Sequence, residues 1–311
     1  MSGTPLRLGT RRSPLALAQS GLVAAAVTAV SGRPVELVEI TTHGDVNREP
    51  LAQIGGTGVF VSALREALLD GRIDFAVHSL KDLPTAPADE LVLAAIPRRE
   101  DPRDALVARD ALVLAELPSG ARIGTGSPRR AAQLRALGRG FEIVDIRGNV
   151  DTRIAYVTSG RLDAVVLAAA GLGRLGRLEV VTELLDPDVM LPAPGQGALA
   201  VECRAGRPEV IAALACLDDA DTKVAVTSER AVLARLEAGC SAPVGVLAEV
   251  TASAGADLFV RAVVGAATAE TAEIFRLSCT GSSNDAVGVG HALADRLLAE
   301  SAYGSLGERV Q

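Results

Sequence analysis

The sequence predicts an α/β protein that ends in a separate α+β domain, and three observations lead to this prediction. The chain has 311 residues, which is enough for two or three domains. Up to about residue 200, hydrophobic runs alternate with helical patterns, as in α/β folds. After about residue 216 the pattern changes to a helix, three strands and a final helix.

An internal duplication organises the first part of the chain. Three segments recur later in the same order: residues 7–14 in 122–128, 36–40 in 142–146, and 71–77 in 160–166. Chance rarely produces three matches in one order. The sequence therefore predicts two α/β domains of similar plan with a cleft between them.

The first repeated segment predicts the start of a helix in each domain. Ser13 and Ser127 are suitable N-caps, and Pro14 and Pro128 suit the first helical position. The free N–H groups of such a helix end bind carboxylates or phosphates. Each segment alone is equally well interpreted as a capped helix, but both have arginines close by, which favours an anion site.

The remaining elements set the domain boundaries. Residues 191–197 return the chain from the second domain, and a strand over 198–203 rejoins the first. The pattern then predicts a helix over 221–237, strands near 246–252, 258–264 and 272–279, and a helix near 285–300. We predict domain 1 over 1–97 and 198–215, domain 2 over 98–197, and domain 3 over 216–311.

Composition excludes several classes of function. Five Phe, two Tyr and no Trp leave few aromatic faces for stacking on bases, and a net charge of -7 gives no general affinity for phosphate backbones or anionic lipid. The amino terminus lacks an apolar signal region, and the apolar stretch 164–173 is too short to span a bilayer. We expect a cytoplasmic protein, without nucleic-acid or membrane partners, whose four cysteines are reduced.

Asp82 is the candidate catalytic carboxylate. It follows the predicted strand 73–77, and the carboxyl ends of strands face the ligand crevice in open α/β sheets. Lys81, one of only two lysines in the chain, precedes it. A solvated Lys–Asp turn is the alternative interpretation.

Arginines at predicted strand ends and helix starts indicate an anionic ligand. Arginine pairs bidentately with carboxylates and stays charged when partly buried. Such a set suits a ligand with several carboxylates; it comprises Arg11, Arg129, Arg130, Arg147, Arg153 and Arg174. Residues 171–176 match GxGxxG, which we interpret as a loop and not as a dinucleotide site, because no suitable helix and acidic strand end follow. No metal-binding or P-loop motif is present.

Cys240 lies in a Gly-containing turn just after a predicted helix. Most lone cysteines are small buried hydrophobic residues. An exposed position on a turn makes covalent attachment chemistry feasible.

These segments together resemble the porphobilinogen deaminase family. The resemblance runs nearly end to end and includes eight segments: GTRRSPLAL from Gly9, HSLKDLP from His78, REDPRDAL from Arg99, GTGSPRR from Gly124, RGNVDTR from Arg147, AGLGRLG from Ala170, LPAPGQGALAVECR from Leu191 and EAGCSAPVG from Glu237. It implies two α/β domains like those of type II periplasmic binding proteins around a cleft, plus a C-terminal α+β domain with a three-stranded sheet.

The resemblance also implies a reaction. A dipyrromethane cofactor is linked through a thioether to Cys240, four porphobilinogens are added head to tail with loss of ammonia, and water releases hydroxymethylbilane. Asp82 stabilises the cationic pyrrole intermediates and transfers protons. The residues implied to bind the carboxylates of cofactor and substrate are Arg11, Ser79, Lys81, Thr125, Ser127, Arg129, Arg130, Arg147, Arg153, Arg174 and Gln196. No metal is required, and a monomer is expected.

Two departures from the family pattern concern the loop around Gln53 and Thr57, where some members have lysines, and Ala238, where many have glycine. Ala238 is tolerated unless its backbone needs a positive φ. The alternative function is a non-catalytic, two-lobed polycarboxylate-binding protein. That alternative gives Asp82, Cys240 and the third domain no role. A dinucleotide-dependent oxidoreductase would rest only on the GxGxxG match.

Overall fold

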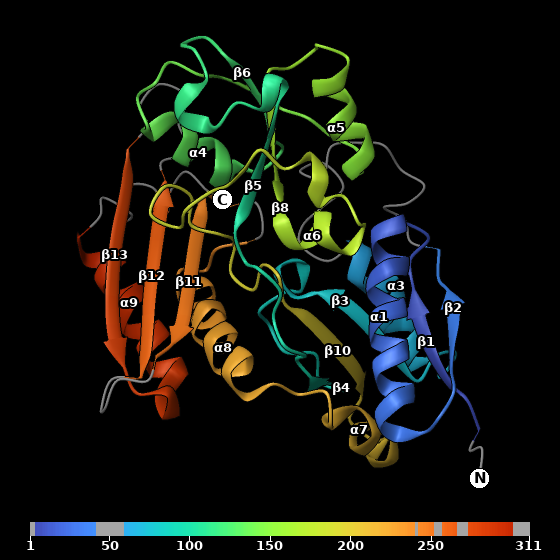
Figure 1. The fold of residues 1–311 in the computed structure, drawn as a ribbon. Coiled ribbons are helices and arrows are strands. Elements are labelled where there is room, and N and C mark those ends of the chain that lie inside the picture. Colours follow the sequence, from blue (N-terminus) through green and yellow to red (C-terminus); the bar gives the residue numbers. More distant parts are fainter. Residues whose placement is uncertain (1–3, 42–58, 240–241, 252–256, 266–272, 301–311) are drawn as a thin grey trace. The chain divides into compact units, whose positions relative to one another are not determined.

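The computed structural model describes residues 4–41, 59–239, 242–251, 257–265 and 273–300. The chain forms two compact units (Figure 1). Unit 1 comprises Met1–Glu100 and Ala198–Lys223, and unit 2 comprises Asp101–Gly197 and Val224–Gln311.

Unit 1 is built on a five-stranded sheet with the order β2-β1-β3-β10-β4. Strands β1 and β3 are parallel to their neighbours β2 and β1, whereas β10 is antiparallel to both β3 and β4. The strands are β1 (Leu6–Thr10), β2 (Val35–Glu39), β3 (Phe75–Ser79), β4 (Leu91–Ala95) and β10 (Leu199–Arg204); the helices are α1 (Pro14–Ser31), α3 (Val59–Leu69) and α7 (Pro208–Ala215), with a short 3-10 helix, η1 (Leu80–Asp82).

The first sheet of unit 2 has the order β7-β6-β8-β5-β9. Its elements are β5 (Asp104–Ala108), β6 (Arg122–Gly124), α4 (Pro128–Ala136), β7 (Glu142–Val144), α5 (Val150–Thr158), β8 (Ala164–Ala168), α6 (Ala169–Arg174) and β9 (Glu183–Leu184). Here too the first three strands of the order are parallel, and the fourth, β5, is antiparallel to β8. The predicted duplication is confirmed, because β1-α1-β2-α3-β3 and β6-α4-β7-α5-β8 follow one plan.

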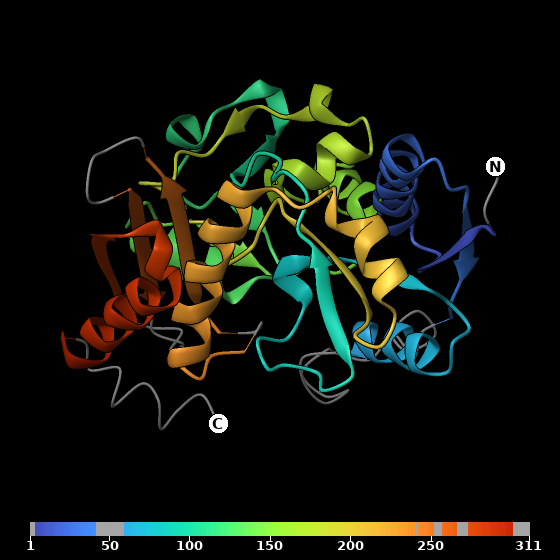
Figure 2. The ribbon, with the colours of Figure 1, turned by 90° about the horizontal axis from the view of Figure 1, so that it is seen from below.

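The second sheet of unit 2 is a three-stranded antiparallel meander. It contains β11 (Val244–Val250), β12 (Leu258–Gly265) and β13 (Ile274–Gly281), each within two residues of its predicted start. Helices α8 (Ala220–Arg235) and α9 (Ala286–Glu300) cover one face of this sheet (Figures 1 and 2). The predicted fold class, two similar α/β domains plus an α+β domain with a three-stranded sheet, is confirmed.

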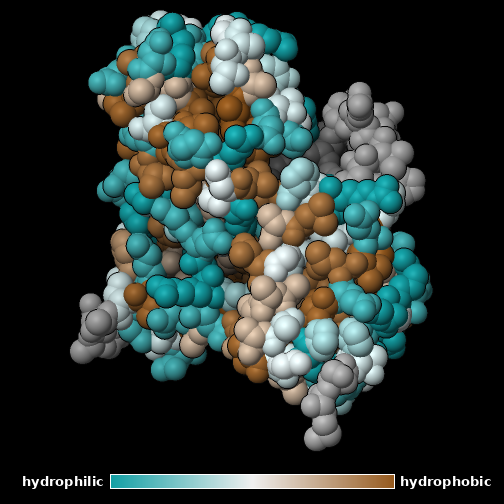
Figure 3. Space-filling model, turned by 45° about the vertical axis from the view of Figure 1, so that its right-hand side comes forward, coloured by the Kyte–Doolittle hydropathy of each residue, from teal (hydrophilic) through white to brown (hydrophobic). Residues whose placement is uncertain are grey.

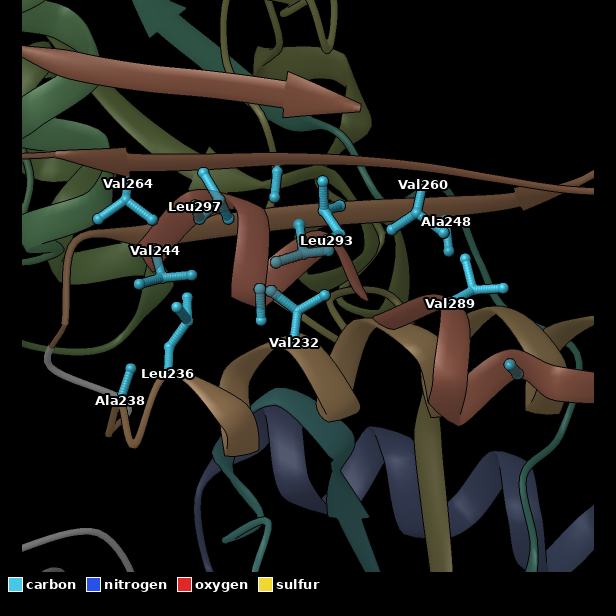
Figure 4. Close-up of a cluster of buried hydrophobic side chains, with 14 of the residues drawn as sticks. Val232, Leu236, Ala238, Val244, Ala248, Val260, Val264, Val289, Leu293 and Leu297 are labelled. Atoms are coloured by element: carbon cyan, nitrogen blue, oxygen red, sulfur yellow. The ribbon is translucent and has the colours of Figure 1, made fainter. Parts of the chain in front are cut away.

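Aliphatic side chains form the core between this sheet and its helices. Val244, Val260 and Val264 of the strands face Val232 of α8 and Leu293 of α9 (Figure 4). Alternate strand residues point to the opposite face, where Leu247 and Val263 pack with Leu191. Helix α4 also packs against β12 and β13. The sheet is therefore covered on both faces, which explains the near-continuous apolar sequences of β11 and β12.

Helices α1 and α4 begin where the sequence predicts, each after a serine N-cap. The Ser13 side chain accepts a hydrogen bond from Ala16 N at 3.2 Å, and Ser127 accepts one from Arg130 N at 3.5 Å. Pro14 and Pro128 open the two helices, as predicted. The expected loop at 171–176 is wrong: residues 169–174 form α6, because the alanine and leucine positions of this segment pack against β8.

One helix, α1, passes a length and composition test for a membrane span, with 18 residues and a mean hydropathy of 1.5. It packs against β1, β2 and β3, and its Val23 and Val27 lie in the core of unit 1. With 22% of its residues buried, α1 therefore packs on the sheet of unit 1 through one face. Hydrophobic residues also lie among hydrophilic ones on the surface shown in Figure 3.

Candidate functional site

Asp82 is presented at the carboxyl end of the central strand of unit 1. It ends the 3-10 helix η1, which directly follows β3. Leu80 N donates to Ala198 O at 3.1 Å and Leu83 N donates to Leu80 O at 3.1 Å, while both leucine side chains are buried. Asp82 itself is exposed, and among the described residues its carboxylate has no hydrogen bond or ion pair. The turn is thus fixed by its leucines and leaves the carboxylate available.

Several predicted binding residues share this edge of the sheet, because β1 and β3 are adjacent and parallel. Ser79 ends β3 and its hydroxyl accepts a hydrogen bond from Gln19 Nε2 at 3.0 Å. Half-buried Arg11 follows β1, and half-buried Lys81 precedes Asp82. Unit 1 therefore brings together Arg11, Ser79, Lys81 and Asp82 at the ends of two neighbouring strands.

A buried charged cluster lies in the same sheet. Glu202 of β10 is 2% exposed, accepts a hydrogen bond from Arg65 Nη2 at 2.8 Å, and lies 3.2 Å from His78 Nε2. Burial alone would raise the pKa of Glu202. The nearby His78 and the hydrogen-bonded guanidinium group of Arg65 outweigh burial and hold the pKa of Glu202 below its ordinary value. The cluster joins α3, β3 and β10, and β3 is the strand that leads to Asp82.

Unit 2 gathers hydroxyl groups at the matching edge of its sheet. Thr125 follows β6, its N–H donates to Val144 O at 2.9 Å, and its hydroxyl accepts from Ser127 N at 3.1 Å. Gly126 between them approaches the segment after β7 so closely that a Cβ atom would lie 2.6 Å from Ile146 O. The segment between β6 and α4 is therefore held tightly against the segment that carries Arg147.

Arg147 and Arg153 form a region of positive charge at this edge. Arg147 is exposed, and Arg153 is half-buried with Nε donating to Gly148 O at 2.9 Å. Burial lowers the pKa of Arg153, the positive charges of Arg130 and Arg147 lower it further, and Asp145 opposes them. Arg147 Nε lies 3.7 Å from Asp145 Oδ2, so two guanidinium groups share one carboxylate here, which fits a carboxylate-bearing cofactor or substrate.

Arg129 and Arg130 lie deeper than the sequence suggests. Arg129 is 3% exposed, and its Nη1 donates to Asp104 Oδ2 at 2.7 Å. Arg130 is 5% exposed; its Nη2 donates to Asp104 Oδ1 at 2.8 Å and its Nη1 to Val166 O at 2.8 Å. Both guanidinium groups are therefore engaged within the protein. Sequence reasoning missed Asp104, although an aspartate that opens the apolar strand DALVA was a usable signal.

The return segment 191–197 is fixed to the same cluster. Gln196 Nε2 donates to Asp104 Oδ1 and to Pro102 O, both at 2.8 Å. Arg174, at the end of α6, donates from Nη2 to Gly197 O at 2.7 Å. Gln133 donates to Leu191 O and accepts from Leu191 N. Gln196 and Arg174 thus position the backbone of this segment.

Cys240, Gln53 and Thr57 lie outside the described residues. Ala238, the departure nearest to Cys240, is buried and has no positive φ. Glu237 has a φ of 51° instead, so the left-handed residue after α8 is the glutamate. Alanine at 238 is accommodated without strain.

A duplicated α/β fold with hydroxyl and guanidinium groups at the carboxyl edge of each sheet is typical of proteins that bind multiply charged anions. Residues 6–212 match the family model described as "Porphobilinogen deaminase, dipyromethane cofactor binding domain", and residues 223–299 match "Porphobilinogen deaminase, C-terminal domain". The chain belongs to the porphobilinogen deaminase family, as its sequence motifs predict. The predicted cofactor, a dipyrromethane, is the group that the first of these domains binds.

Curated relatives agree over the whole chain. It is 62% identical over 321 residues to porphobilinogen deaminase 1 of Streptomyces coelicolor, covering 100% of both chains. It is 58% identical over 303 residues to porphobilinogen deaminase of Nocardia farcinica, covering 96% of this chain and 86% of the relative. Among solved structures, the methionine-binding protein MetQ aligns with 68% of this chain and 89% of its own, at 13% identity and a TM-score of 0.41. This likeness is too distant to add to the description of the fold that the strand order gives.

Proposed function

We propose that this chain is a hydroxymethylbilane synthase, a transferase of tetrapyrrole (porphyrin and haem) biosynthesis. It joins four porphobilinogens head to tail onto a covalent dipyrromethane, releases one ammonia for each, and hydrolyses the product from the primer. The observation that carries the proposal is the match of both family models, which together span nearly the whole chain. When bound, the dipyrromethane supplies the free pyrrole carbon on which the chain grows.

Binding is the task of the cationic edge of unit 2. Porphobilinogen carries an acetate and a propionate, so carboxylates accumulate as the chain grows. Arg147 and Arg153 provide positive charge that Asp145 only partly balances. Thr125 and Ser127 add hydroxyl groups beside the start of α4. Charge-assisted hydrogen bonds from these groups orient the carboxylates, and Arg11 and Ser79 do the same at the edge of unit 1.

Asp82 is the group that acts on the reacting pyrrole. In each addition the C–N bond of porphobilinogen breaks, ammonia leaves, a C–C bond forms, and the attacked pyrrole carbon loses its proton. Positive charge develops on the pyrrole rings during these changes. An exposed carboxylate accepts hydrogen bonds from pyrrole N–H groups, stabilises that charge, and transfers the proton. The absence of a competing partner among the described residues supports this role for Asp82.

Cys240 is the proposed attachment residue, through a thioether. We also infer that the enzyme acts as a cytoplasmic monomer without nucleic-acid or membrane partners. We retain the predicted domains: 1–97 with 198–215, 98–197, and 216–311. The family match supports the presence of this cofactor, because the model over residues 6–212 is described by it, and Cys240 lies in the range matched by the C-terminal domain model.

The test is the intact mass of the denatured protein before and after addition of porphobilinogen. We expect wild type to exceed its polypeptide mass by one dipyrromethane and to show a ladder of added pyrrole units. Cys240→Ser should show neither, whereas Cys216→Ser, which changes an exposed cysteine on another element, should match wild type. A wild-type mass that equals the polypeptide and does not respond to porphobilinogen would favour the polycarboxylate-binding alternative.

A further inference from the structure

Asp104 is a fully buried carboxylate on which two consecutive arginines of α4 converge. Its exposure is 0%. Arg129 Nη1 reaches Oδ2 at 2.7 Å, and Oδ1 accepts from Arg130 Nη2 at 2.8 Å, Arg130 Nε at 3.1 Å and Gln196 Nε2 at 2.8 Å. Both carboxylate oxygens are therefore engaged by donors from α4 and from the return segment 191–197.

The position of the two arginines explains why a buried carboxylate is needed. Arg129 and Arg130 lie in the first turn of α4, directly after Pro128. Positive charges at a helix amino terminus are unfavourable, because the helix dipole is positive there. Burial makes them costlier, and it lowers the pKa of Arg129 despite Asp104. Asp104 cancels one of the two charges and leaves one.

The remaining charge acts on the proposed binding site. Arg130 N donates to the hydroxyl of Ser127, one of the binding groups, at 3.5 Å, and the charge of Arg130 contributes to the lowered pKa of Arg153. Arg130 also retains N–H groups beyond those it donates to Asp104 and Val166 O, since a guanidinium has five. Where Asp104 holds Arg130 therefore determines where that charge and those donors point.

We propose that Asp104 is a positioning residue for the carboxylate-binding site of unit 2: through its hydrogen bonds it fixes Arg129 and Arg130 at the start of α4, and thereby holds the groups that receive the carboxylates of primer and substrate in place. The proposal rests on the proposed function, which makes polycarboxylates the ligands. A role limited to charge balance predicts a different outcome. Asp104→Asn makes the site more positive, so charge alone would leave carboxylate binding unchanged or stronger, whereas lost positioning would weaken it.

The experiment compares wild type with Asp104→Asn, Gln196→Met and the control Asp101→Asn. Gln196→Met removes one donor to Asp104 and leaves its charge in place. Asp101 forms a partly exposed ion pair with Arg103, two residues along the same segment. Three readouts are needed: the fraction of chains that carry the primer, from intact mass; the KM and kcat of the loaded fraction for porphobilinogen; and the thermal midpoint.

We expect Asp104→Asn to lower primer occupancy and to raise KM about tenfold, with kcat changed less than about threefold, the size expected for one or two charged hydrogen bonds. Gln196→Met should raise KM about threefold with the same small effect on kcat. Asp101→Asn should match wild type in all three readouts. If Asp104→Asn does not fold, Gln196→Met decides.

Wild-type occupancy and KM in Asp104→Asn, or in Gln196→Met where only that variant folds, would overturn the positioning role while leaving the proposed function intact. A lower thermal midpoint with unchanged KM would likewise reduce Asp104 to a stabilising residue. A wild-type chain without primer or turnover would overturn the proposed function, and with it this inference.

Discussion

Replacing Asp82 with asparagine separates catalysis from stability. The side chain is exposed at the end of η1, and the part of the chain that the structure describes gives its carboxylate no ion pair or hydrogen bond. Leu80 and Leu83, which fix the turn, are unchanged in the variant. We therefore expect the free energy of unfolding to stay within about 0.5 kcal/mol of wild type.

The loss of turnover should be much larger. A carboxylate about 4 Å from a developing positive charge contributes between about 1 kcal/mol in water and about 4 kcal/mol at an effective dielectric constant near 20. Substrate displaces water from an exposed carboxylate, which favours the upper part of this range. Asparagine also cannot accept the pyrrole proton, and general base catalysis contributes about 10²- to 10⁴-fold. We expect kcat to fall by at least about 10²-fold.

The assay is single-turnover formation of the pyrrole ladder by intact mass, with a urea titration of the same preparation. Asp89→Asn serves as the control, because Asp89 is an exposed carboxylate in the same unit outside the proposed site. It should keep wild-type turnover. An Asp82→Asn enzyme with more than about a tenth of wild-type kcat would refute the role of this carboxylate, since even the weak electrostatic limit predicts a loss of about fivefold before proton transfer is counted.

Three further predictions concern the surrounding structure. Glu202→Gln should lower the free energy of unfolding by about 3 kcal/mol at pH 7, because it leaves the Arg65 guanidinium group without its buried ion-pair partner. Because the folded pKa of Glu202 is depressed, wild type loses this contribution as pH falls below the ordinary glutamate value, so urea midpoints of the two proteins should converge in acid. Gly126→Ala should cost about 2 kcal/mol and raise KM, since its Cβ meets Ile146 O, whereas Gly206→Ala, with open space, should be neutral. Glu237→Gly should raise the thermal midpoint by about 2 °C, because the φ of 51° suits glycine; an unchanged melting curve would contradict this.

Local chemistry made much of the fold predictable. A serine followed by proline specified both duplicated helix starts, and the hydrogen bonds at Ser13 and Ser127 follow from that chemistry. The failure at 171–176 has a physical cause. Glycines permit a loop but do not require one, and the side chains of Ala169, Ala170 and Leu172 gain more by packing in a short helix.

The site was predictable only as a set of residue types. Sequence position places Asp82 and the arginines at strand ends and helix starts, but it does not report burial. Arg129 and Arg147 looked equivalent in the sequence, yet one is 3% exposed and the other lies on the surface. The difference is decided by Asp104, whose pairing with Arg129 and Arg130 depends on a strand and a helix brought together only by the fold.

Strand β10 pairs with β3 and β4 but lies much later in the sequence, and this affects the order in which the sheets can form during synthesis on the ribosome. Strand β4 has β10 as its sheet neighbour, and β3 has β10 along one edge. Ala95, the last residue of β4, is made about 100 residues before β10 begins at Leu199, an interval of about ten seconds at ordinary elongation rates. The sheet of β5–β9 is meanwhile fully translated, because its strands end at Leu184. The sheet encoded second is therefore the first that can be completed, and the strand leading to Asp82 gains its last neighbour only afterwards.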